Sequence, residues 1–109
     1  MKIRPATRED FRAFYGKTPP MSLRAVVGER NAGDIVGIGG YYLSKGHAVA
    51  FVDHRGATKK EMVIGGRAVM ELIEQFGGTV YATNESGDSR ALRHFGFVEH
   101  GPVWRYERI

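Results

Sequence analysis

The sequence predicts an α+β domain in three layers, with helices flanking a mixed, mostly antiparallel central sheet. Apolar runs of strand length alternate with turn residues over 23–53, as in an antiparallel meander. The segment 61–76 repeats apolar residues at three- and four-residue steps, which is typical of an amphipathic helix. A strand-like run follows at 79–83, so a right-handed crossover with locally parallel pairing is expected. The expected order of elements is β-α-β-β-β-α-β-α-β.

Length and composition limit the class of protein. The chain of 109 residues suffices for a single domain, expected over residues 1–109. Cysteine is absent, which excludes disulfides, zinc–thiolate sites and cysteine nucleophiles. No apolar run approaches the roughly 20 residues of a membrane span, and no signal segment opens the chain. These features predict a soluble, cytoplasmic protein.

The formal charge of +4 is spread over single arginines and lysines, with one Lys59-Lys60 pair. A solvated surface explains this charge most simply. The alternative is a polyanionic ligand, either nucleic acid or a phosphate-bearing cofactor. Because the chain has no arginine-rich arm, zinc-finger spacing or aromatic RNA-binding signature, its motifs do not favour nucleic acid.

Capping residues predict the first elements. Residues 2–5 are expected to form a short edge strand, since a proline closes the run. Thr7 and Asp10 have the spacing of a capping box, which predicts a helix over 8–15 that Gly16 ends.

Three strands are expected next, at 23–30, 35–43 and 47–53. The second contains several glycines, which indicate a β-bulge or a place where something packs against bare backbone. Tyr41 and Tyr42 should face opposite sides of this strand. The glycines are Gly37, Gly39 and Gly40.

The C-terminal part predicts a short helix and a final strand or hairpin. Ser86 or Asp88 can cap the helix, and Gly96 can take the left-handed conformation that ends it. Phe97 then packs back on that helix. Gly101-Pro102 divides the last strand-like segment.

This order of elements, with the residues that mark it, resembles the GNAT superfamily of acyl-CoA-dependent N-acyltransferases. The resemblance rests on residues 3–10, 36–39 and 51–53 and on the stretch from Asn84 to Phe97. That last stretch, with its strand, asparagine, helix and Gly-Phe ending, is the most specific part. In its brevity and loop chemistry the chain looks most like compact members encoded by bacteriophages.

The resemblance implies two central strands that splay apart and hold the pantetheine arm of an acyl-CoA between them. Phe51, Val52 and Asp53 would supply main-chain contacts to this arm. Asn84 would hydrogen-bond the arm from the next strand. Acetyl-CoA is the default acyl donor, as a co-substrate.

By the same resemblance, the pyrophosphate would lie at the N-terminus of the helix over 61–76, where free amides and the helix dipole favour anions. Lys59, Lys60 and Arg67 would add positive charge there. Catalysis would consist mostly of positioning an amine against the thioester while backbone amides polarise the carbonyl oxygen.

The chain departs from the family at two places. The family's phosphate loop has an Arg or Gln followed by a closely spaced glycine pair, whereas residues 55–61 lack that pair and Gly65-Gly66 comes later. Either the loop is longer and these glycines begin the helix, or they lie inside it for packing. We favour the second, because Met62 and Val63 already fit the helical period. Leu92 occupies the position at which many members carry a tyrosine acid, so no general acid can be assigned.

His47 and Asp53 are the candidate catalytic residues. His47 opens a central strand and could act as a base, although a surface histidine is the commoner explanation. Asp53 is alternatively a carboxylate that ends a strand and starts a turn. No two histidines have i, i+4 spacing, so no metal site is expected.

Three functions follow as hypotheses. The first is an N-acetyltransferase that moves an acetyl group from acetyl-CoA to an amine, either a small molecule or a protein lysine or N-terminus. The second is a non-catalytic binding or assembly protein with the same fold, which the two departures favour. The third is a basic nucleic-acid-associated domain. No motif specifies the acceptor, no membrane partner is expected, and a homodimer could complete a wide acceptor site.

Overall fold

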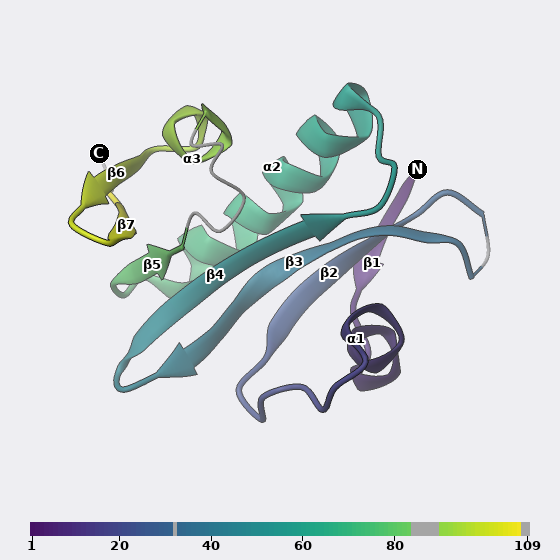
Figure 1. The fold of residues 1–109 in the computed structure, drawn as a ribbon, viewed down its shortest axis with the longest axis horizontal. Helices are drawn as coiled ribbons and strands as arrows, with labels where there is room; N and C mark the ends of the chain where they lie inside the picture. The colour runs from purple at the N-terminus through teal and green to yellow at the C-terminus, as the bar shows by residue number, and fades with distance from the viewer. Residues whose placement is uncertain (32, 84–89, 108–109) are drawn as a thin grey trace.

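The computed structural model describes residues 1–31, 33–83 and 90–107. This part of the chain forms seven strands and three helices (Figure 1). In chain order they are β1 (Lys2–Pro5), α1 (Arg8–Tyr15), β2 (Arg24–Glu29), β3 (Ile35–Ser44), β4 (His47–His54), α2 (Lys59–Phe76), β5 (Val80–Ala82), α3 (Arg90–His94), β6 (Phe97–His100) and β7 (Val103–Tyr106).

The strands form one sheet in the order β1-β2-β3-β4-β5-β7-β6. β4 and β5 pair in parallel, and the other neighbouring strands are antiparallel. Helices α2 and α3 lie on one face of the sheet and α1 lies on the other (Figure 1). The predicted fold class, a mixed and mostly antiparallel sheet between helices, is therefore confirmed. The final segment forms the hairpin β6–β7.

Helix α1 begins and ends where its capping residues predict. The Thr7 hydroxyl accepts a hydrogen bond from the Asp10 amide, and the Asp10 carboxylate accepts one from the Thr7 amide. Gly16 ends the helix with φ 71°. Phe11 and Phe14 of this helix are buried with Val27 and Ile38 of the sheet. This cluster fixes α1 against β2 and β3.

Helix α2 begins at Lys59, two residues before the predicted start. Thr58 caps it and forms a reciprocal capping box with Glu61, which places both lysines of the pair inside the first turn. Gly65 and Gly66 lie inside the helix, as expected from the packing alternative. Gly66 is buried against the ring of Phe95.

The glycines of β3 allow close approach of other elements. A Cβ at Gly39 would lie 2.6 Å from a methyl group of Val69 on α2, and one at Gly40 would lie 2.0 Å from the carbonyl oxygen of Arg24. The ladder between β2 and β3 also shifts register between Gly28 and Glu29. Both expectations for this strand, a bulge and bare backbone contacts, are confirmed.

The described residues contain neither a helix that could span a membrane nor a cluster of metal ligands. None of their helices is long and apolar enough to cross a membrane. No three His, Cys, Asp or Glu side chains among them lie close enough together to hold a metal ion.

Candidate functional site

The central feature of the candidate site is the place where β4 continues after its pairing with β5 has ended. The parallel ladder joins Ala48 to Val80, Val49 to Tyr81 and Ala50 to Ala82. β4 then continues to His54 with no pairing strand on this side among the described residues. Figure 1 shows this long end of β4 running past β5 toward the start of α2. We call this side of β4, from Phe51 to His54, the open edge.

Backbone direction decides which residues of β4 present polar groups to the open edge. The Ala48 amide donates to the Thr79 carbonyl at 3.0 Å, on the side of β5, and the Arg55 amide donates to the Val36 carbonyl at 2.8 Å, on the side of β3. Because backbone groups alternate along a strand, the amide and carbonyl of Val52 face the open edge. The backbone groups of Phe51 and Asp53 face β3 instead. Of the three residues predicted to contact the pantetheine arm through their main chain, only Val52 can offer hydrogen bonds at the open edge.

The start of α2 carries two lysines, but a carboxylate of its first turn already accepts one of the free backbone amides there. Lys59 and Lys60 are exposed in the first turn. The Glu61 carboxylate accepts the Thr58 amide at 2.9 Å and forms an ion pair with Arg30 at 2.7 Å. The Arg30 guanidinium and this backbone bond lower the pKa of Glu61 to about 2. A phosphate at this helix start would therefore meet two lysines together with an ionised carboxylate that is paired with Arg30.

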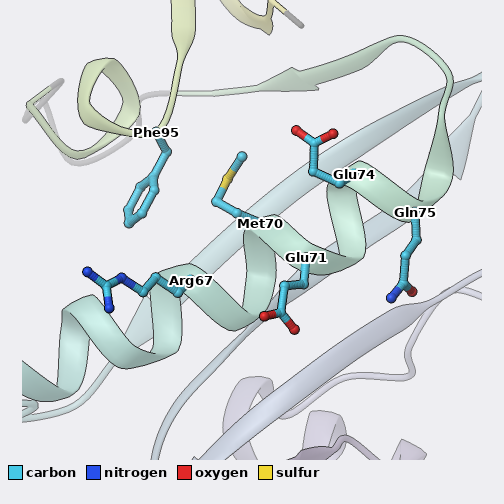
Figure 2. A pocket seen from close by; sticks show the side chains of 6 residues that line it. All are labelled: Arg67, Met70, Glu71, Glu74, Gln75 and Phe95. Carbon is cyan, nitrogen blue, oxygen red and sulfur yellow. The ribbon is translucent and has the colours of Figure 1, made fainter. Parts of the chain in front are cut away.

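Arg67 does not lie with the lysine pair. It is on α2, about 12 Å along the helix axis from Lys59. It lines a shallow groove of about 480 Å³ between α2 and Phe95. Figure 2 shows the Phe95 ring above the helix, with Arg67 and Met70 on either side of it. The other residues lining this groove are Glu71, Glu74 and Gln75.

The two candidate catalytic residues lie at opposite ends of β4. About 20 Å of extended strand separates His47 from Asp53. The imidazole of His47 contacts the ring of Tyr81, with 5.1 Å between centroids. Asp53 instead accepts a hydrogen bond from the Tyr15 hydroxyl at the end of α1. The structure therefore brings Asp53, but not His47, to the open edge. Asn84, the fourth predicted contact to the pantetheine arm, lies outside the described residues.

The comparison with solved structures bears on the fold. The chain is similar to the solution NMR structure described as "Putative N-Acetyl Transferase YhhK from E. coli Bound to Coenzyme A". The TM-score is 0.62 at 16% sequence identity, with 97% of this chain and 98% of the other covered. The chain has a GNAT-like fold. No protein-family model and no curated protein sequence matches it. The resemblance to phage-encoded members is not tested by this comparison and stays a prediction.

Within this GNAT-like fold, the position expected for a tyrosine acid carries no acidic group. Leu92 is partly buried and packs against the core cluster that contains Val69, Phe97 and Trp104. In this chain the side chain at this position therefore contributes to packing, as expected for a leucine.

Sequence reasoning missed two residues near the open edge. Tyr15 reaches Asp53 from α1, and burial together with this hydrogen bond raises the pKa of its hydroxyl. Arg30 reaches Glu61 and the Gly56 carbonyl from the turn after β2. Both contacts join residues far apart in the chain. Periodicity and local motifs carry no signal for them.

Proposed function

We propose that this protein binds an acyl-CoA along the open edge of β4 and transfers the acyl group, with acetyl as the default, to an amine. The observation that carries the proposal is the end of the β4–β5 ladder at Ala50 and Ala82. Beyond it, the backbone amide and carbonyl of Val52 have no pairing strand among the described residues, and they match the amide groups of a pantetheine arm.

The start of α2 supports the same proposal. Lys59 and Lys60 would bind the diphosphate with their side chains and with first-turn amides that the capping box does not use. Arg67, farther along the helix, would reach only a more distant part of the donor. The bound donor would supply an activated thioester carbonyl. The acceptor nitrogen attacks this carbon, the C–S bond breaks to release the CoA thiolate, and the amine proton passes to solvent or a base.

The test of binding is a titration with acetyl-CoA, followed by thermal unfolding. A ligand at a hundredfold over its Kd stabilises the native state by about 2.7 kcal/mol, which raises Tm measurably. The Lys59→Ala/Lys60→Ala variant should weaken binding by roughly threefold to tenfold, since each partly exposed charge pair contributes modestly. Arg24→Ala/Lys45→Ala is the matched control, because both side chains are exposed toward the opposite end of the sheet from this helix start. The absence of any shift at millimolar acetyl-CoA would contradict the proposal.

A second candidate is a non-catalytic protein that binds acyl-CoA as a ligand. Leu92 at the place of the acid and Glu61 at the helix start favour it. Release of free thiol from acetyl-CoA in the presence of amines separates the two: transfer releases thiol, and binding alone does not. A nucleic-acid partner would instead show an affinity that falls steeply with salt.

A further inference from the structure

A second molecule can reach the open edge from one face of the sheet. On the other face, α2 and α3 cover the end of the ladder, where Ala50 and Ala82 are buried (Figure 1). On the face of α1, the helix covers β2 and β3 through Phe11 and Phe14. No described helix covers the part of this face beside β5. An acceptor would therefore approach from the side of α1.

Two side chains of β4 point to the face of α1, on either side of Val52. Phe51 packs toward the helix, with its ring centroid 6.1 Å from that of Tyr15. The carboxylate of Asp53, on the same face, accepts the hydroxyl of Tyr15. An aromatic ring and a carboxylate thus flank the residue whose backbone faces the open edge.

Within the part of the chain that the structure describes, the carboxylate of Asp53 is not paired with a basic side chain. Its side chain is exposed, and no Lys, Arg or His among the described residues forms an ion pair with it. One hydrogen bond from Tyr15 leaves other acceptor positions of the carboxylate open. A free carboxylate beside aromatic faces is the chemistry that recognises an organic ammonium group.

The aromatic cluster of α1 already binds one cation. The guanidinium of Arg55 lies 4.2 Å from the ring centroid of Phe14 and donates to that residue's carbonyl. The Tyr15 ring is 5.1 Å from the ring of Phe14, and Tyr42 lies 6.3 Å from Phe51 on the far side. Arg55 is held over Phe14, and Phe11 packs on the rings of Tyr15 and Phe51 with centroids 4.6 and 6.1 Å away. A second cation would therefore meet the carboxylate of Asp53 and the parts of these two rings that remain exposed.

We propose that Asp53, Tyr15 and Phe51 form the acceptor subsite, and that this subsite selects an acceptor that keeps one positive charge while another of its amines reacts, such as an aliphatic diamine. The position beside a thioester rests on the proposed function, whereas recognition of the cation does not. Asp53 binds the retained ammonium, and Phe51 packs on the methylene chain. Tyr15 is a positioning residue, because it acts by holding the carboxylate.

The test is an NMR titration of the CoA-loaded protein with three probes of equal chain length: the terminal diamine, diol and dicarboxylate of butane. CoA without an acyl group prevents turnover. We expect the diamine to bind about tenfold more tightly than the diol and to shift the ring signals of Tyr15 and Phe51, while the dicarboxylate leaves them unchanged.

Asp53→Asn should remove the preference for the diamine. Tyr15→Phe should reduce it severalfold. Glu99→Gln removes an exposed carboxylate on β6 and should change nothing.

Equal binding of the diamine and the diol would overturn the proposal. The proposal would also be overturned if the Asp53→Asn variant is as stable as the wild type and still binds the diamine more tightly than the diol. Failure of CoA to bind is a separate result, which would contradict the proposed function. In that case the same titration of the free protein still decides whether Asp53 recognises a cation.

Discussion

Two adjacent glycines in α2 have opposite surroundings. A Cβ at Gly66 would lie 2.4 Å from the Cζ atom of Phe95, whereas a Cβ at Gly65 would meet no atom within 4 Å. Gly66 therefore allows the α3–β6 segment to pack closely on α2. Gly65 has no such packing role, and its cost is the ordinary cost of glycine inside a helix.

Exchanging each glycine for alanine should separate these roles. Gly65→Ala should stabilise the protein by about 0.5–1 kcal/mol, because alanine loses less backbone entropy on folding. Gly66→Ala should destabilise it by roughly 1–3 kcal/mol, because the Phe95 ring must leave its place. Urea unfolding measures both changes. Stabilisation by Gly66→Ala would show that the ring moves aside freely, and destabilisation by Gly65→Ala would reveal a contact at that position.

At the scale of elements, Arg4 joins α1 to two strands. Its guanidinium donates to Asp10 in the capping box of α1 at 2.7 Å and to Glu29 on β2. These bonds lower the pKa of Asp10 to about 2 and also lower the pKa of Glu29. The ordinary values of the two carboxyls are 3.8 and 4.5. The stabilisation is thus present above pH 4.5 and is lost as pH falls toward 2.

The variant Arg4→Gln should be less stable at neutral pH and should lose less stability across this acid window. Its two carboxyls return toward their ordinary pKa values, so fewer protons are taken up on unfolding. Arg12→Gln is the control, since Arg12 is an exposed arginine of the same helix. Urea unfolding at several pH values measures the slopes. Parallel slopes for the wild type and Arg4→Gln would contradict the assigned pairing.

The elements themselves could be predicted where one local signal determines them. The period of apolar residues gives α2, and the spacing of Thr7 and Asp10 gives the start of α1. The same spacing at Thr58 and Glu61 marks the true start of α2, so that boundary could also have been found from the sequence. The length of the β4–β5 ladder could not, because no residue type marks the point at which two strands stop pairing.

At the scale of the whole molecule, the candidate site depends on contacts between elements that are distant in sequence. Tyr15 and Asp53 meet because the end of α1 packs beside the end of β4. Arg30 and Glu61 meet because the turn after β2 lies beside the start of α2. The sequence could predict which residues carry charge, but these pairings require the packed sheet. For that reason His47 was as plausible a candidate as Asp53 before the fold was known.

The ion pair of Arg30 with Glu61 stabilises the start of α2 but weakens anion binding at the same position. Glu61 closes the capping box of α2, and its negative charge lies where a diphosphate would bind. In Glu61→Gln the amide oxygen can still accept the Thr58 amide, while Arg30 is released to the anion. We expect a slightly lower Tm without ligand and an affinity for CoA that is roughly threefold to tenfold higher at low salt. Calorimetric titration measures this gain, which added salt should reduce because the site is exposed.

Arg30→Gln should weaken CoA binding relative to Glu61→Gln, since it leaves the carboxylate unpaired beside the phosphates. Weaker CoA binding by Glu61→Gln than by the wild type would mean that the diphosphate does not lie at the start of α2.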